Sequence, residues 1–127
     1  MTGELVLIVD DNEKNVKLAR DVLRFAGFRT VEAFTGSEGF ASATEHGPDV
    51  ILMDIRLPDM EGTEVVRRLK DEPQTAGIPV IALTAYAMKG DRERFLAAGF
   101  DGYLEKPVSV KELPAQVRAY CRREEAR

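Results

Sequence analysis

Short runs of consecutive apolar residues alternate along the chain with segments whose apolar positions recur at helical spacing. Five segments are predicted as strands: Leu5 to Val9, Arg29 to Phe34, Val50 to Met53, Pro79 to Leu83 and Gly102 to Glu105. Runs of branched apolar side chains without a polar position are typical of strands that are covered on both faces. The second segment contains Arg29 and Glu32, so we expect it at an edge of the sheet.

The segments between and after these strands are predicted as helices. They run from Asn12 to Ala26, from Thr35 to about Gly47, from Gly62 through Leu69, from Lys89 to Ala98 and from Ser109 to Arg122. The second and fifth helices begin with the Ser/Thr-x-x-Glu pattern of a capping box, at Thr35 to Glu38 and Ser109 to Glu112. Pro114 leaves two possibilities for the last helix, because a proline deep in a helix removes a backbone hydrogen bond. Either its first turn is kinked, or the regular helix starts at Pro114.

This alternation predicts an α/β fold, in which a parallel sheet has helices on both faces because right-handed crossovers place each helix against the sheet. The uniformly apolar first and third strands should be central. A doubly wound, flavodoxin-like sheet of five strands in the order 2-1-3-4-5 satisfies this requirement. The length of 127 residues predicts one domain, residues 1–127, without an output domain.

Charge and composition narrow the classes of function. The 22 acidic and 18 basic residues leave a net charge of -4, so no strong basic field would hold a nucleic acid. The longest purely apolar run is far shorter than the roughly 18 residues of a membrane span, and the first four residues have no basic start for a signal peptide. Cys121 is the only cysteine and cannot form an internal disulfide. We therefore expect a cytoplasmic protein that binds neither nucleic acid nor membrane.

Charged and hydroxyl side chains follow four of the predicted strands. Asp10 and Asp11 follow the first strand, Asp54 the third, Thr84 the fourth and Lys106 the fifth. In a sheet of this order, ligands bind beyond the carboxyl ends of the strands, where the strand order reverses. We therefore expect these side chains to meet at one edge of the sheet.

Three neighbouring carboxylates repel one another and favour a bound cation. Oxygen ligands without histidine or cysteine favour a hard ion, and a site with room for water and phosphate suits Mg²⁺ better than Ca²⁺. Asp10 and Asp11 are suited to hold the metal, although Asp11 could instead cap the helix that follows, as could Asn12. With the metal and Lys106 screening negative charge, Asp54 could attack a phosphoryl group and form an aspartyl phosphate. Thr84 could donate a hydrogen bond to a phosphoryl oxygen.

The stretches LVLIVDDNEKN, DVILMDIRLPDMEG, IPVIALTAYA and GYLEKP carry a resemblance that covers about residues 4 to 122. In them the chain resembles the receiver domains of bacterial two-component response regulators, particularly stand-alone ones. The resemblance implies Asp54 as the phosphoacceptor, Asp10 and Asp11 as the metal-binding pair, and Thr84 and Lys106 as the switch hydroxyl and the site lysine. It further implies that the backbone carbonyl of Arg56 binds the metal, that the Lys106–Pro107 bond is cis, and that Tyr103 is the switch aromatic.

The implied function is that of a phosphorylation-activated signalling switch, which catalyses only its own phosphotransfer and slow self-dephosphorylation. The phosphoryl donor would be a phosphohistidine of a sensor histidine kinase or a histidine phosphotransfer protein, with Mg²⁺ as cofactor. The fourth helix, fifth strand and fifth helix would form the surface that changes on phosphorylation and contacts an unknown downstream protein. Bulky Arg56 and Tyr86, two residues after Asp54 and Thr84, are expected to shield the phosphoryl group from water.

Three alternatives fit part of the pattern. A phosphohydrolase of the haloacid dehalogenase type needs a second acid two residues after its nucleophile, and that position holds Arg56. A flavodoxin-like module would place the phosphate of FMN after the first strand, where Asp10, Asp11 and Glu13 would repel it. A receiver fold that only docks to partners is disfavoured because every position of the expected chemistry is filled.

Overall fold

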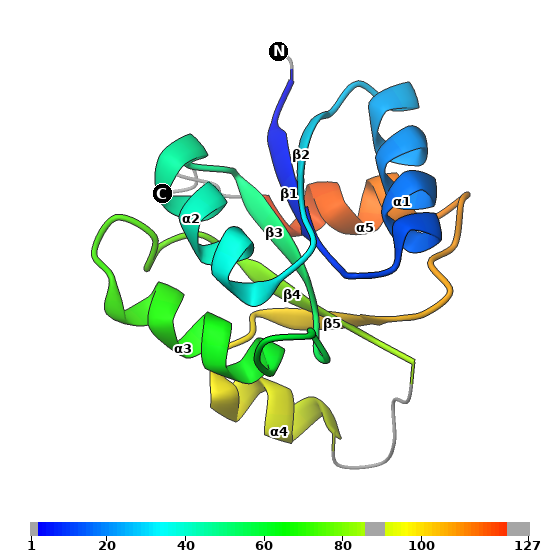
Figure 1. Cartoon of the computed structure of the whole chain (residues 1–127). Coiled ribbons are helices and arrows are strands. Elements are labelled where there is room, and N and C mark those ends of the chain that lie inside the picture. Colours follow the sequence, from blue (N-terminus) through cyan, green and yellow to red (C-terminus); the bar gives the residue numbers. More distant parts are fainter. Residues whose placement is uncertain (1–2, 86–90, 122–127) are drawn as a thin grey trace.

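The computed structural model describes residues 3–85 and 91–121 (Figure 1). The strands are β1 (Leu5–Val9), β2 (Arg29–Ala33), β3 (Val50–Asp54), β4 (Val80–Thr84) and β5 (Gly102–Glu105). The helices are α1 (Glu13–Phe25), α2 (Gly36–His46), α3 (Gly62–Asp71), α4 (Asp91–Ala98) and α5 (Leu113–Tyr120). Strands and helices alternate as the sequence predicted. The expected helical start at Lys89 and end at Arg122 lie outside the described residues, as does Tyr86.

The strands form one parallel sheet in the predicted order β2-β1-β3-β4-β5. Every residue of β1, β3 and β4 is buried, as the apolar runs indicated. Strand β2 lies at an edge, where Arg29 is exposed and Glu32 half-buried. Because the chain moves outward from β1 in both directions, the strand order reverses between β1 and β3, and their carboxyl ends lie side by side.

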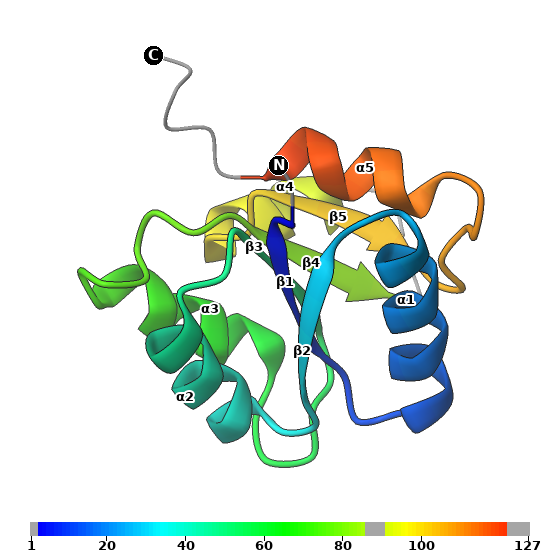
Figure 2. The same cartoon turned by 90° about the horizontal axis from the view of Figure 1, so that it is seen from above.

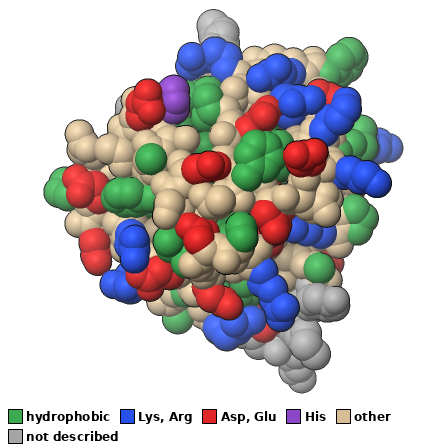
Figure 3. Space-filling model, in the orientation of Figure 1, with side chains coloured by type: hydrophobic (Ala, Val, Ile, Leu, Met, Phe, Trp, Pro, Cys, Tyr) green, Lys and Arg blue, Asp and Glu red, His purple; other side chains and the backbone are tan. Residues whose placement is uncertain are grey.

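Helices cover both faces of the sheet (Figure 2). Helices α1 and α5 pack on one face with Val6 and Ile8 of β1, whereas α2, α3 and α4 pack on the other face with Leu7 and Val9. Successive strand residues therefore contribute to two different cores, which explains why the central strands contain no polar position before their last residue. Within the described residues, no helix is long and apolar enough to cross a membrane. On the face in Figure 3, acidic and basic side chains are interspersed.

The beginnings of α1 and α2 follow the predicted caps, with one open alternative decided in α1 and one correction in α2. The Asn12 side chain accepts hydrogen bonds from the backbone of α1, so Asn12 rather than Asp11 is the cap. Thr35 accepts from the Glu38 N–H at 3.1 Å, as a capping box requires. The Glu38 carboxylate, however, accepts from the N–H of Phe34 at 2.8 Å instead of the N–H of Thr35.

Helix α5 starts later than its capping pattern predicted. Ser109 Oγ accepts from the Glu112 N–H at 3.1 Å, but the residues between them form a turn and the regular helix begins at Leu113. Pro114 consequently lies in the first turn, where its missing N–H has no intrahelical partner to lose. Of the two possibilities considered above, the later start is confirmed. Cys121, just after this helix, is buried in the core on the α1 and α5 face.

Candidate functional site

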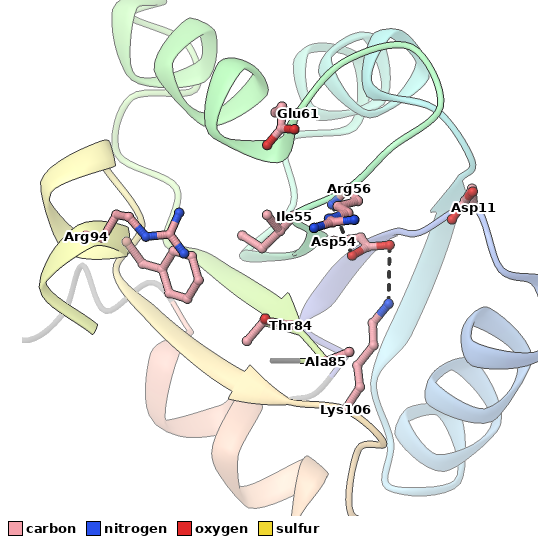
Figure 4. A pocket seen from close by; sticks show the side chains of 10 residues that line it. Asp11, Asp54, Ile55, Arg56, Glu61, Thr84, Ala85, Arg94 and Lys106 are labelled. Atoms are coloured by element: carbon pink, nitrogen blue, oxygen red, sulfur yellow. Dashed lines mark hydrogen bonds and ion pairs between the residues drawn. The ribbon is translucent and has the colours of Figure 1, made fainter. Parts of the chain in front are cut away.

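The predicted chemical side chains meet at the carboxyl edge of the sheet. Asp10 follows β1, Asp54 and Thr84 end β3 and β4, and Lys106 follows β5. A cleft of about 400 Å³ is lined by Asp11, Asp54, Thr84 and Lys106 (Figure 4). Asp10 is completely buried beside it and contacts the lysine. The structure thus brings together the residues that the strand ends predicted.

Three carboxylates make this edge strongly acidic. Asp10, Asp11 and Asp54 each place one carboxylate oxygen so that the three oxygens lie within 4.8 Å of one another. Asp11 is exposed, whereas Asp54 is only 8% exposed. A set of oxygen donors without imidazole or thiolate matches the preference of Mg²⁺. These residues could therefore hold a divalent cation.

A single ammonium group lies between two of these carboxylates. Lys106 Nζ is 3.0 Å from Asp10 Oδ2 and 3.2 Å from Asp54 Oδ2. Burial acts to lower the pKa of Lys106, but its hydrogen bond to Asp10 and the charges of Asp10 and Asp54 outweigh burial, so the pKa is raised. The lysine therefore stays charged, and this one ammonium contacts two of the three carboxylates.

The two buried carboxylates differ in their surroundings. Asp10 accepts hydrogen bonds from the Asn12 N–H at 3.0 Å and the Asn15 side-chain amide at 3.4 Å, in addition to Lys106. Asp54 lines the cleft and accepts from the Arg56 N–H at 3.3 Å. Burial and the charge of Asp10 raise the pKa of Asp54, with Lys106 acting in the opposite direction. Asp54 is therefore the buried carboxylate that an incoming group can reach.

The backbone around β4 and β5 sets the position of the lysine. The Lys106 N–H donates to the Thr84 carbonyl at 2.8 Å, which continues the pairing of the two strands by one residue. The Lys106–Pro107 bond is cis, as the resemblance implied. Tyr103 on β5 is half-buried, and its ring centroid lies 5.9 Å from that of Phe95 on α4. The predicted switch aromatic thus joins the fifth strand to the fourth helix.

The loop from β3 to α3 closes the cleft on the side of Asp54. Arg56, which is exposed, pairs with Glu61 in an isolated antiparallel bridge, and both line the cleft. The Gly62 N–H donates to the Ile55 carbonyl at 2.6 Å, and a Cβ atom on Gly62 would overlap the Asp54 carbonyl oxygen. The absence of a side chain at this position therefore allows α3 to begin directly against the end of β3.

Sequence reasoning missed part of the cleft wall. Glu61 approaches from the loop and Arg94 from α4 (Figure 4). Phe95 of α4 also lines the cleft. Arg94 pairs with Asp91 at 2.9 Å and lies over the Phe95 ring, 4.8 Å from its centroid. Polar residues on a helix show no periodic signal that would reveal which of them faces a cleft.

Comparisons with known proteins agree with this geometry. The response regulator receiver domain family matches residues 6–118. The polar-differentiation response regulator DivK of Brucella ovis is 47% identical over 115 residues, covering 91% of this chain and 94% of that protein. The chemotaxis response regulator CheY4 of Vibrio cholerae superimposes with a TM-score of 0.88 at 28% identity, covering 94% of this chain and 99% of that one.

A further solved structure bears on the cation site. The receiver domain of a sensor histidine kinase from Pseudomonas aeruginosa PAO1 is 36% identical, with a TM-score of 0.85, and the match covers 94% of this chain and 98% of that one. Its structure has a magnesium ion coordinated in the active site cleft. From the family match and these relatives, we conclude that the chain belongs to the receiver domain family of two-component response regulators, which are phosphorylated by histidine kinases and act in phosphorylation-dependent signalling.

Proposed function

We propose that this protein is a signalling switch that accepts a phosphoryl group on Asp54 from a phosphohistidine of a histidine kinase or a histidine phosphotransfer protein. One observation carries the proposal: three carboxylate oxygens lie within 4.8 Å of one another, and a single ammonium contacts two of these carboxylates. This excess of negative charge beside a cleft suits a site that takes up a divalent cation before it takes up phosphate.

Each side chain has a distinct role in the transfer. An Asp54 carboxylate oxygen forms the bond to phosphorus while the bond from phosphorus to the donor imidazole nitrogen breaks, and that nitrogen keeps the electron pair. Lys106, already 3.2 Å from Asp54 Oδ2, pairs with a phosphoryl oxygen as a point charge. The Thr84 hydroxyl donates to another phosphoryl oxygen.

The donor set fits Mg²⁺, the cofactor of the proposal. Asp10, Asp11 and Asp54, with the backbone carbonyl of Arg56, would hold it. When bound, the metal supplies positive charge that offsets the carboxylates and the incoming phosphoryl oxygens. The magnesium ion in the related Pseudomonas aeruginosa receiver supports this assignment.

The signal would leave through α4, β5 and α5. Thr84 ends β4, and its backbone carbonyl accepts from the N–H of Lys106, which directly follows β5. Tyr103 contacts Phe95, whose side chain is buried under α4 and also lines the cleft. A movement of the threonine hydroxyl toward a phosphoryl group can therefore alter how Tyr103 and α4 pack. The altered surface would be read by a downstream protein in the cytoplasm.

The test is incubation with Mg²⁺ and a small acyl phosphate, followed by measurement of the intact mass. The wild-type protein should gain one phosphoryl group, and Asp54→Asn should gain none. Asp101→Asn is a matched control, because Asp101 lies at the opposite end of the sheet, before β5, and should leave the gain unchanged. No added mass on the wild-type protein, or added mass that peptide mapping places away from Asp54, would contradict the proposal.

A further inference from the structure

The loop from Ile55 to Glu61, which carries Arg56, reaches α2 through one acidic side chain. The Gly36 N–H donates to Asp59 Oδ1 at 2.7 Å, and the Ser37 N–H donates to Asp59 Oδ2 at 3.0 Å. Both oxygens of a single carboxylate are thus engaged by the first turn of a helix that lies more than 20 residues earlier in the chain. The two backbone hydrogen bonds lower the pKa of Asp59, so the carboxylate is ionised at neutral pH.

This contact is additional to the helix's own cap. The first N–H groups of a helix have no partner within the helix. Thr35 satisfies the N–H of Glu38 through its side chain, at 3.1 Å. The N–H groups of Gly36 and Ser37, which precede it, are the ones that Asp59 takes. The N-terminus of α2 is consequently completed by the loop that follows β3.

Packing strengthens the same connection. A Cβ atom on Gly36 would lie 2.6 Å from Met60 Cγ, so the Met60 side chain occupies the space beside this glycine. Helix α2 is itself fixed to the sheet, because Gly39 lies against the Val9 side chain and Ala43 is buried. The tip of the loop is therefore attached to a rigid part of the core.

The base of the loop is fastened separately. The Gly62 N–H donates to the Ile55 carbonyl at 2.6 Å, and Arg56 and Glu61 form their antiparallel bridge just inside this hydrogen bond. Arg56 therefore lies between a base attached to the end of β3 and a tip attached to α2. Loss of the attachment at the tip would leave the backbone of Arg56 held by its hydrogen bond to Asp54 and by the base of the loop, without the connection to α2.

We propose that Asp59 is a positioning residue for the cation site: by joining the loop tip to α2, it fixes the backbone carbonyl of Arg56 relative to Asp10 and Asp54. This inference rests on the proposed function, because it takes the Arg56 carbonyl as a ligand of Mg²⁺. Asp59 itself does not line the cleft. Its removal should weaken Mg²⁺ binding while leaving every ligand in place.

The experiment titrates Mg²⁺ into the metal-free protein and follows backbone amide signals by NMR. Asp59→Ala should bind Mg²⁺ about tenfold more weakly than the wild-type protein, as is usual when a group that orients a metal ligand is removed. Asp59→Asn retains one oxygen acceptor and should fall between the two. Thr35→Ala removes the local cap of the same helix without touching the loop, and should bind Mg²⁺ as the wild-type protein does. Hydrogen exchange at Gly36 and Ser37 would show whether the bridge is lost in each variant.

Two outcomes would overturn the positioning role. One is a Mg²⁺ affinity of Asp59→Ala equal to that of the wild-type protein, with exchange at Gly36 accelerated. The other is an equal loss of affinity in Thr35→Ala, which would assign the effect to a general loosening of α2. If the wild-type protein does not bind Mg²⁺, the proposed function is refuted, and this inference fails with it. The titration of the wild-type protein alone distinguishes this outcome from the other two.

Discussion

The two ends of the sheet each hold a lysine paired with aspartate, but the ratio of carboxylates to ammonium groups differs between them. At the carboxyl end, Lys106 contacts both Asp10 and Asp54, and Asp11 adds a third negative charge. At the amino end, the Lys70 ammonium lies 3.2 Å from a single carboxylate, that of the residue preceding β5. Among these lysine and aspartate side chains, the carboxyl end keeps an excess of negative charge, whereas the pair at the amino end is balanced.

The hydrogen bonds at the amino end complete the contrast. Lys70 Nζ donates to the carbonyls of Ala76 and Ile78 at 3.4 and 3.0 Å, and Asp101 Oδ2 also accepts from the Val80 N–H at 2.8 Å. This lysine therefore ties the end of α3 to the loop before β4 and to the turn before β5. The same two residue types build a closed structural contact at one end and the proposed phosphorylation site at the other. The difference lies in the number of carboxylates per ammonium.

The largest expected difference is in chemistry. Lys106→Met should slow phosphorylation by an acyl phosphate by about 100-fold, because a charge that stabilises the transferring group is removed. Lys70→Met deletes the same group at the other end and should leave the rate within about twofold of the wild-type value, well below the roughly 100-fold loss. Time courses of the phosphorylated mass would measure both rates. Equal slowing in the two variants would remove the functional distinction between the ends.

At the amino end, loss of the lysine should affect the stability of the fold and not the rate of phosphorylation. Lys70→Met should lower the free energy of unfolding by about 2 kcal/mol, since it leaves two carbonyls and the Asp101 carboxylate without their charged donor. Asp101→Asn retains an oxygen acceptor for the Val80 N–H and should cost about 1 kcal/mol. Urea unfolding would give both values. An unchanged stability in Lys70→Met would show that this contact is not structural.

Removal of a carboxylate at the crowded end should stabilise the protein. Without Mg²⁺, Asp54→Asn should raise the free energy of unfolding by about 1 kcal/mol, because an ionised group that is disfavoured by burial and by Asp10 is lost. Added Mg²⁺ should stabilise the wild-type protein and narrow this difference. A decrease in stability on Asp54→Asn would argue against excess negative charge in the folded state.

The smallest expected effect is on the pH dependence of two carboxyl groups that are close in sequence. Asp54 and Asp59 should titrate on opposite sides of their ordinary pKa of 3.8. The raised pKa of Asp54 means that its contribution to the stability of the metal-free fold is complete below 3.8 and is lost as the pH rises through the raised value. The lowered pKa of Asp59 means that its contribution is complete above 3.8 and is lost as the pH falls through the lower value. Carboxyl-carbon NMR of the metal-free protein would measure both, and a reversed order would contradict the structure.

The sheet and most of the site could be predicted because local patterns determine them. The apolar runs Leu5–Val9 and Val50–Met53 are followed directly by Asp10 and Asp54, and parallel strands bring such ends to one edge. The edge position of β2 followed from Arg29 and Glu32. The late start of α5 was one of two possibilities that Pro114 left open.

Two of the long-range carboxylate contacts could not be predicted in this way. Asp59 and Asp101 find partners 23 and 31 residues distant, at Gly36 and Lys70. A single carboxylate in a loop produces no periodicity, and its partner depends on how helices pack on the sheet. The contribution of Arg94 to the cleft depends on the rotation of α4 about its axis, which its few apolar residues do not specify.

The lack of a side chain at Gly62 limits how this protein can be redesigned. The glycine hydrogen atom occupies the place where even a methyl group would overlap the Asp54 carbonyl oxygen. A substitution at the first residue of α3 would therefore shift the end of β3, which holds Asp54, or displace the helix. Libraries that vary this loop should keep position 62 constant.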